Sequence, residues 1–260
     1  MQKKALRLGI ISALQEEQAG LVAQMTDVQT VSRGMRNYIR GNLWGVDCIC
    51  VLSRLGKVAS AATAATLIER FDVTFLIFTG VAGSADPLVN IGDIVIAENL
   101  VQHDMDTRPL FPRFEIPLTG LSKFASDLAL SVHLAKAAQQ FVDQDLRREI
   151  TGEQRAVFRL HQPQVHRGLI ASGDEFIGSA ARLYELKQHF PDLLAVEMEG
   201  AAVAQVCFEF GIPFSVIRTI SDGANEDSAV DFLAFIRQVA SVYAFYTTRR
   251  LCSILLEEGC

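Results

Sequence analysis

The sequence predicts an α/β fold with a largely parallel sheet. Short apolar runs bounded by turn residues alternate along the chain with segments whose apolar residues recur at helical spacing. The chain has 260 residues, of which 50% are hydrophobic, and this is enough to bury a full core without disulfide or metal staples. Neither an internal repeat nor a linker interrupts the pattern, so we expect a single domain over residues 1–260.

The first half of the chain predicts five strands and two helices. An opening strand and a helix with an acidic start precede a strand pair, which is joined at Trp44–Gly45 and followed by an alanine-rich helix. The next strand is rich in β-branched and aromatic residues and is expected to end at the tight crossing Gly80–Ser84. The expected strands are 6–13, 35–43, 46–53, 73–79 and 92–97, and the expected helices are 16–25 and 59–70.

The second half begins with a long irregular segment. Three prolines and a cluster of aromatic residues between Glu98 and Gly120 predict a loop, and loops of that length are usually functional. Helices and strands then alternate again to the end of the chain. The expected helices are 121–141, 146–160, 180–190, 199–210 and 228–256, and the expected strands are 165–172, 193–196 and 214–220.

Composition excludes several classes of protein. The chain carries 24 basic and 30 acidic side chains, a net charge of -6, and no basic run longer than two residues, so it lacks the cationic clusters of a nucleic-acid binder. Its longest apolar stretch, residues 73–85, is shorter than the roughly 20 residues of a membrane-spanning helix. We interpret the N-terminus as a strand rather than a signal peptide. The five sparse cysteines are typical of reduced thiols in a cytoplasmic protein.

Polar residues follow several of the predicted strands. In open α/β sheets, ligands bind beyond the carboxyl ends of the strands. Such positions hold Glu17, residues 80–84, residues 172–176, Glu197–Glu199 and residues 221–223. We therefore expect these groups to converge on one edge of the sheet.

The acidic residues of this set have both structural and functional interpretations. Glu199 could simply complement the dipole of its helix, but Glu197 and Glu199 flank Met198 where a carboxylate can accept two vicinal sugar hydroxyls. Asp222 precedes a glycine and could be a turn residue, or an acid whose protonated form is favoured by partial burial. Glu17 is ambiguous in the same way.

Familiar cofactor and nucleophile motifs are missing. The segment Gly80–Ser84 has neither the GxGxxG nor the GxxxxGK[ST] spacing, so we expect no NAD or ATP there. His103–Asp106 offers metal ligands without a matching histidine elsewhere, which favours a structural loop and no metal. The nucleophile elbow G-x-S-x-G does not occur.

Segments spread in order over nearly the whole chain carry a family resemblance. They are residues 8–17, 55–57, 79–83, 92–95, 103–104, 168–174 with Phe176, 196–199 and 220–222. The ordered set resembles the 5'-methylthioadenosine/S-adenosylhomocysteine nucleosidases of the nucleoside phosphorylase superfamily. The resemblance implies a three-layer α/β/α sandwich around a mixed, partly barrel-like sheet, a homodimer, and cleavage of a nucleoside N-glycosidic bond without a cofactor.

The resemblance also implies roles for particular residues. Glu17 would activate the attacking water, and Asp222, supported by Ser221, would protonate N7 of the leaving adenine. The implied substrate-binding positions are Leu55 at the 5'-alkylthio tail, Val81, Phe176 and Phe232 at the base, Ile177 at the purine edge, and Met198 and Glu199 at the ribose, with Glu197 beside them. An acid at the leaving group and a base at the water suit an oxocarbenium-like transition state, as in glycosidases.

Three features depart from the family pattern. Val81 stands where a Ser or Thr commonly helps to position the catalytic aspartate, and Arg54 replaces the usual glycine before Leu55. The loop 105–114 also differs from the commoner version, which reaches into the neighbouring subunit's pocket. These departures affect the predicted range of substrates.

Other functions remain open at this stage. A phosphorolytic enzyme needs cationic groups for phosphate, whereas Glu16 and Glu17 occupy the first strand-to-helix loop, so hydrolysis is favoured and only Arg54 keeps phosphorolysis open. Futalosine, adenosine or inosine are alternative substrates. A noncatalytic nucleoside-binding protein is disfavoured by the joint presence of Glu17, Glu199 and Asp222.

Overall fold

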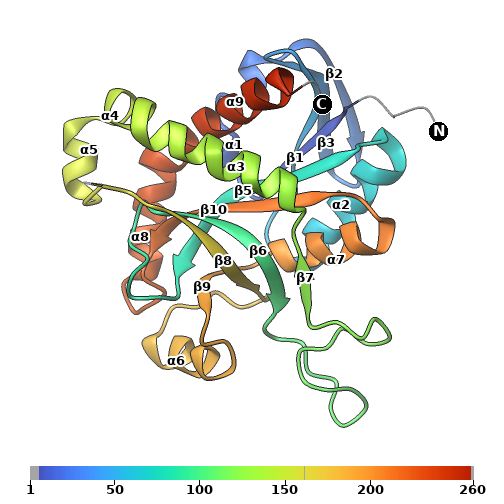
Figure 1. Ribbon diagram of the computed structural model, residues 1–260, viewed down its shortest axis with the longest axis vertical. Helices are drawn as coiled ribbons and strands as arrows, with labels where there is room; N and C mark the ends of the chain where they lie inside the picture. Colours follow the sequence, from blue (N-terminus) through green and yellow to red (C-terminus); the bar gives the residue numbers. More distant parts are fainter. Residues whose placement is uncertain (1–5, 161, 259–260) are drawn as a thin grey trace.

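The computed structural model describes residues 6–160 and 162–258, and all the described strands belong to one sheet (Figure 1). The strands are β1 (Leu8–Ser12), β2 (Thr26–Arg33), β3 (Arg36–Leu43), β4 (Val46–Leu52), β5 (Phe75–Ser84), β6 (Ile94–Gln102), β7 (Lys123–Ala125), β8 (Val165–Ser172), β9 (Leu193–Glu197) and β10 (Phe214–Asp222). The helices are α1 (Gln15–Gln18), α2 (Lys57–Phe71), α3 (Leu128–Gln140), α4 (Leu146–Glu149), α5 (Gly152–Val157), α6 (Ala180–His189), α7 (Gly200–Phe210), α8 (Ser228–Phe235) and α9 (Ser241–Glu257).

Part of the sheet closes on itself. The strand order is β10-β6-β8-β9-β5-β1-β4-β3-β2, and β10 also pairs with β5, so β5, β10, β6, β8 and β9 form a ring. Within the ring, β10 is parallel to β5 and antiparallel to β6, and β9 is antiparallel to β5. The sheet continues outward from β5 through the parallel strands β1 and β4 to the antiparallel strands β3 and β2. The prediction of a mixed, partly barrel-like sheet is confirmed.

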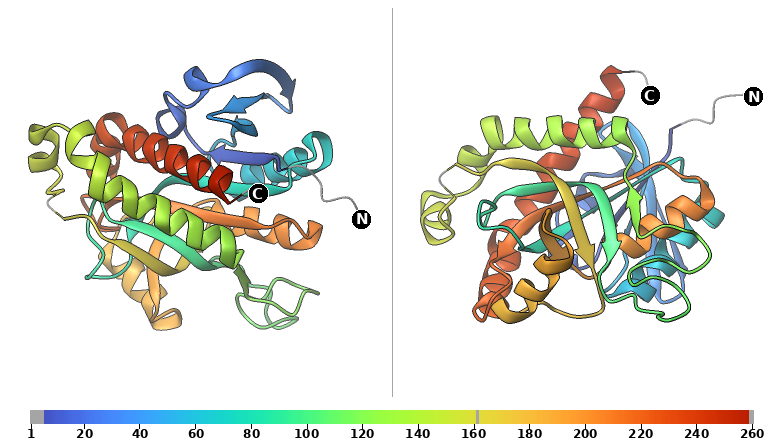
Figure 2. Two further views of the ribbon diagram at one scale, coloured as in Figure 1. Left: turned by 45° about the horizontal axis from the view of Figure 1, so that its top comes forward. Right: turned by 60° about the horizontal axis from the view of Figure 1, so that its bottom comes forward.

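Helices cover both faces of the sheet, which gives the three expected layers (Figure 2). Successive apolar residues of β1 point to opposite faces, so Ile10 joins the core under α3 and α9 while Ile11 joins the core under α2 and α7. Helix α3 packs against α9, and α2 packs against α7. The first core includes Leu134 and Leu251, and the second includes Leu67 and Val203.

Two predictions in the first half were wrong. The expected helix 16–25 ends after four residues, because the chain turns at Gly20, whose φ of 89° is outside the helical region. Leu21 and Met25 are buried after this turn, which explains their apolar spacing. Strand β2 follows and was missed because all eight of its residues are exposed, so the sequence shows no alternation of apolar and polar residues there.

The tight crossing expected at Gly80–Ser84 is also wrong, because β5 continues through both glycines to Ser84. The pairing partners of this extension come from distant segments. Thr219 of β10 pairs with Val81, and Val196 of β9 pairs with Gly83, so ring closure holds the segment extended.

The long loop and the helix after it have different boundaries from those predicted. Strand β6 extends to Gln102 because β8 pairs with it along its length, and the irregular segment begins only after it. Residues 123–125 form β7, and α3 starts at Leu128, where the Asp127 side chain accepts a hydrogen bond from the Leu130 amide. The expected helix 146–160 is divided into α4 and α5 by Thr151, which caps α5.

Among residues 6–160 and 162–258, no helix combines the length and apolar character that crossing a membrane requires. Cys48, Cys50, Cys207 and Cys252 are free thiols in the interior.

Candidate active site

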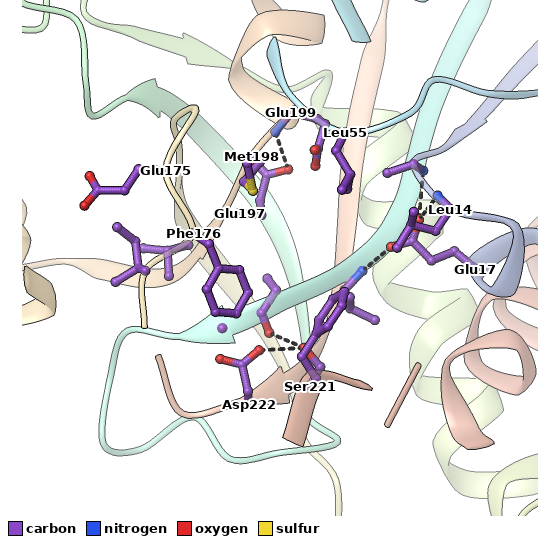
Figure 3. A pocket seen from close by; sticks show the side chains of 17 residues that line it. Leu14, Glu17, Leu55, Glu175, Phe176, Glu197, Met198, Glu199, Ser221 and Asp222 are labelled. Atoms are coloured by element: carbon purple, nitrogen blue, oxygen red, sulfur yellow. Dashed lines mark hydrogen bonds between the residues drawn. The ribbon is translucent and has the colours of Figure 1, made fainter. Parts of the chain in front are cut away.

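A pocket lies where β1, β5, β9 and β10 end, and it contains all the residues that the sequence analysis placed at the site (Figure 3). Its wall consists of Ala13, Leu14, Glu17, Leu55, Val81, Ala82, Gly83, Glu175, Phe176, Ile177, Val196, Glu197, Met198, Glu199, Ser221, Asp222 and Phe232. Polar groups from several strand ends therefore do converge at one edge of the sheet. Glu175, from the polar segment 172–176, also lines the wall although no role was expected for it.

Backbone amides just after β1 and within β5 hold the carboxylate of Glu17. Its Oε2 accepts hydrogen bonds of 2.8 Å from the amides of Ala13 and Leu14, and its Oε1 accepts one of 3.1 Å from the Val81 amide. The side chain is buried. Burial raises the pKa of Glu17, against the opposing effects of Arg218 and of these amides. The result is a carboxylate fixed in one orientation with an increased basicity.

Gly80 lets the carboxylate of Glu17 approach β5. A Cβ at position 80 would lie 2.7 Å from Glu17 Oε1, which is closer than a real side chain tolerates. A Cβ at Gly83 would likewise lie 2.9 Å from Asp222 Oδ1. The two glycines that suggested a loop in the sequence are therefore strand positions that leave room for two carboxylates.

Asp222 is the last residue of β10 and faces the pocket (Figure 3). Ser221 Oγ donates a 2.8 Å hydrogen bond to its Oδ2, and the Ala224 amide donates one of 3.0 Å to its Oδ1. Burial raises the pKa of Asp222, and the hydrogen bonds oppose this. The acid form of Asp222 therefore persists to higher pH than in an exposed aspartate.

Glu199 precedes α7 without capping it. The Glu199 side chain makes no capping hydrogen bond with this helix, and its Oε1 instead accepts a 2.8 Å hydrogen bond from the Gly56 amide in the loop before α2. Burial raises the pKa of Glu199, and the nearby charge of Glu197 adds to the effect. The dipole interpretation does not account for these contacts, whereas a ligand-facing carboxylate does.

Glu197 is engaged with the protein itself. Its carboxylate accepts hydrogen bonds from the amides of Glu199 (3.1 Å) and Gly200 (2.8 Å and 2.9 Å) and from the hydroxyl of Ser172. Arg218 Nη2 lies 2.6 Å from Glu197 Oε2 in an ion pair that is almost completely buried. Both oxygens are thus occupied, which leaves Glu199 as the freer acceptor for a sugar.

Arg218 is the residue supporting the pocket that the sequence analysis missed. It is 1% exposed, lies 4.2 Å from the centroid of the Phe78 ring and donates to the Phe78 carbonyl oxygen at 3.0 Å. The sequence did contain a signal, because Arg218 is a lone arginine inside an apolar strand. A buried guanidinium needs a carboxylate partner, so such an arginine indicates a buried acid nearby.

The apolar part of the wall suits a planar ring. The rings of Phe176 and Phe232 meet edge to face with centroids 6.0 Å apart, and Ile177 is buried beside them. Phe176 is half-exposed, so one side of its ring is open to a ligand.

The ionisable side chains of the wall are all acidic. Five carboxyl groups line it, from Glu17, Glu175, Glu197, Glu199 and Asp222, and within the described part of the chain no cationic side chain does. Such a wall favours water or a cation over an anion. The described residues also contain no group of three or more His, Cys, Asp or Glu arranged to hold a metal.

Two segments discussed for other roles lie outside this wall. Asp104, weighed as a metal ligand, forms a 2.6 Å ion pair with Lys57 and accepts a hydrogen bond from the Asp174 amide. Arg54, the one residue that kept phosphorolysis open, does not line the pocket.

Comparisons with known proteins give the same relatives from sequence and from structure. The family model of the phosphorylase superfamily matches residues 7–249. The 5'-methylthioadenosine/S-adenosylhomocysteine nucleosidase of Shewanella oneidensis is 36% identical over 253 residues, which cover 97% of this chain and 97% of that protein.

Two solved structures illustrate the likeness in three dimensions. The 5'-methylthioadenosine/S-adenosylhomocysteine nucleosidase of Neisseria meningitidis, in complex with methylthio-immucillin-A, superposes with a TM-score of 0.84 at 31% identity, over 96% of this chain and 99% of that one. The native futalosine hydrolase of Helicobacter pylori gives a TM-score of 0.81 at 30% identity, over 96% and 99% of the two chains. This chain therefore belongs to the phosphorylase superfamily and, within it, to the 5'-methylthioadenosine/S-adenosylhomocysteine nucleosidases.

Proposed function

We propose that this protein hydrolyses the N-glycosidic bond of 5'-methylthioadenosine and S-adenosylhomocysteine, releasing adenine and the 5'-thioribose. The observation that carries the proposal is the pair Glu17 and Asp222. Both carboxyl groups are buried and fixed by hydrogen bonds, and they face one pocket from different walls (Figure 3). Paired carboxyl groups of this kind supply the acid and the base of glycoside hydrolysis.

The reaction assigns one proton transfer to each residue. Asp222, whose pKa is raised by burial, donates a proton to N7 of adenine as the bond between C1' and N9 breaks. Positive charge then develops on the ribose, where Glu199 accepts hydroxyl hydrogen bonds and stabilises the cation. Glu17 takes a proton from the attacking water as the water oxygen forms a bond to C1'.

Glu197 has a positioning role in this scheme. Its contacts with the Glu199 and Gly200 amides fix the start of α7, and its ion pair balances the charge of Arg218. The sequence analysis counted Glu197 among the substrate-binding positions, beside Glu199 at the ribose. We keep the hydroxyl contacts on Glu199 and assign Glu197 to the support of the wall.

The charge of the wall supports water over phosphate as the nucleophile. A phosphorylase must orient an anion with cationic donors, and among the described residues none lines this pocket. The carboxylate of Glu17 would repel phosphate from the position where the nucleophile attacks.

We also propose a cellular compartment and a domain organisation for this protein. The interior free cysteines support a reducing compartment, for which we propose the cytoplasm. We also propose that residues 1–260 act as one domain, since the described strands form a single sheet.

Hydrolysis is tested by incubating the purified protein with 5'-methylthioadenosine in phosphate-free buffer. We expect adenine and free 5'-thioribose, measured by chromatography, with no increase in rate when phosphate is added. Asp222→Asn should reduce kcat by at least about 10²-fold, because an amide cannot protonate N7. Release that requires phosphate and yields a sugar 1-phosphate would contradict the hydrolytic mechanism.

The role of Gly80 is tested by Gly80→Ala. The added methyl group would displace the Glu17 carboxylate, and because misplacement by about 1 Å can cost 10²-fold, we expect kcat to fall by about 10-fold or more. Gly152→Ala is the matched control, since a Cβ there has its nearest neighbour 3.9 Å away. Equal activity of the two variants would show that the fixed position of Glu17 is not needed.

The buried carboxyl of Glu199 makes stability depend on pH. Its pKa is raised in the folded state, so between about 4.5 and that higher pKa the folded protein holds a proton that the unfolded chain has released. Stability from this group therefore falls as pH rises through that interval. One pKa unit corresponds to about 1.4 kcal/mol, so we expect Glu199→Gln to raise the free energy of unfolding at pH 9 by about 1 kcal/mol or more, and by less at pH 5.

Urea unfolding at the two pH values checks this expectation, with Glu209→Gln on the exposed face of α7 as the control. A gain for Glu199→Gln that is the same at both pH values would show that the titration of Glu199 is not its source.

We propose a homodimer on the basis of the segment between β6 and β7. This segment extends away from the body of the chain and contributes nothing to the wall of its own pocket (Figures 1 and 2). It carries the exposed apolar side chains of Leu110 and Leu118, which another subunit could cover. Sedimentation equilibrium at micromolar concentration should give twice the mass of the chain, and the mass of a single chain would contradict the proposal.

A further inference from the structure

A second cavity adjoins the active site beside Leu55. It measures about 920 Å³ and shares Ala13, Leu14 and Leu55 with the active-site wall. In the proposed function, Leu55 lies at the 5' tail of the nucleoside. A short 5' substituent would end at Leu55, whereas a longer one would continue from there into the second cavity.

The charge of this cavity is opposite to that of the active-site wall. Arg36 and Arg54 line it, and within residues 6–160 and 162–258 no Asp or Glu does. The Arg36 guanidinium donates to the backbone carbonyls of Gly34, Ser53 and Ala59, and Arg54 Nη2 donates to the Met35 carbonyl at 2.8 Å. These neutral acceptors leave both positive charges uncompensated by a carboxylate.

Gln18 also lines this cavity, but its Nε2 is itself buried from solvent, so the two arginines are the cationic donors that a ligand in the cavity can reach.

The backbone at Arg54 is strained. Its φ of 71° lies in the left-handed region, which costs a non-glycine residue roughly 1–2 kcal/mol. Glycine is the residue that this conformation favours. Strain of this kind is typical of residues kept for a ligand contact.

We propose that Arg54, assisted by Arg36, binds a carboxylate at the end of the 5' substituent, so that the enzyme favours substrates whose tail carries a carboxylate. This inference rests on the proposed function and deepens it. A guanidinium is the side chain best suited to a carboxylate, because it can donate two parallel hydrogen bonds. Two kinds of tail supply this group: the amino acid of S-adenosylhomocysteine and the aryl carboxylate of futalosine.

The test is the ratio of kcat/KM for S-adenosylhomocysteine to kcat/KM for 5'-methylthioadenosine. We expect Arg54→Gln to lower this ratio about tenfold, because only the first substrate has a carboxylate, and Arg54→Lys to retain part of it. Arg33→Gln removes an exposed arginine from β2 that does not line the cavity, and it should keep the wild-type ratio. Arg54→Gly, which suits the backbone conformation, serves if the glutamine variant is unstable.

Two further experiments identify the chemical group of the substrate that Arg54 recognises. A decarboxylated analogue of S-adenosylhomocysteine should be insensitive to Arg54→Gln, and added KCl should slow the wild-type reaction with S-adenosylhomocysteine more than that with 5'-methylthioadenosine. Futalosine, assayed in parallel, shows whether the aryl carboxylate or the amino acid depends more on Arg54.

An equal loss for all substrates, or an unchanged ratio in Arg54→Gln, would overturn the proposal. Absence of adenine release from every substrate would instead contradict the proposed function. In that case the ratio of the dissociation constants of the two nucleosides, measured by calorimetry on wild type and Arg54→Gln, decides the subsite on its own.

Discussion

The buried ion pair between Arg218 and Glu197 is the interaction on which the rest of the site depends. It joins β10 to the end of β9, and Glu197 also fixes the Glu199 and Gly200 amides at the start of α7. Removing either charge would leave the other buried without a partner, which is strongly destabilising. The same guanidinium opposes the rise in the pKa of Glu17. One cation beneath the pocket therefore supports an arrangement of carboxylates that would otherwise repel one another.

Closure of the sheet supplies the geometry for this arrangement. Because β10 pairs with both β5 and β6, Arg218 and Asp222 lie on a strand next to Gly80 and Gly83. The glycines leave space in the wall of the ring, and the carboxyl groups of Glu17 and Asp222 occupy it. A sheet with free edges would bring fewer strand ends to one place. Ring closure and the two glycines thus act together to place an acid and a base in a single pocket.

The distribution of charge connects this architecture to substrate choice. The ionisable side chains of the proposed active-site wall are acidic, which suits water as the nucleophile and a cationic transition state. The adjoining cavity carries two arginines and begins beside Leu55, where we propose that the 5' tail lies. Membership of the 5'-methylthioadenosine/S-adenosylhomocysteine nucleosidases accounts for the first region. The second depends on Arg54, a residue in which this chain departs from the common pattern of its family.

The sequence alone determined the α/β class and most buried strands, because apolar periodicity and turn residues are local signals. It also placed acidic residues after the buried strands, whereas the apolar positions of the pocket followed only from the resemblance to the nucleosidases. It missed β2, whose residues are all exposed, and misjudged β5, whose last residues are held extended by β9 and β10. It also counted Glu197 among the substrate-binding positions, since only the fold reveals that Arg218, Ser172 and two amides already occupy its oxygens. Which carboxylate faces a ligand and which supports the wall was decided by tertiary structure, because hydrogen-bond partners far apart in the chain determine where a side chain points.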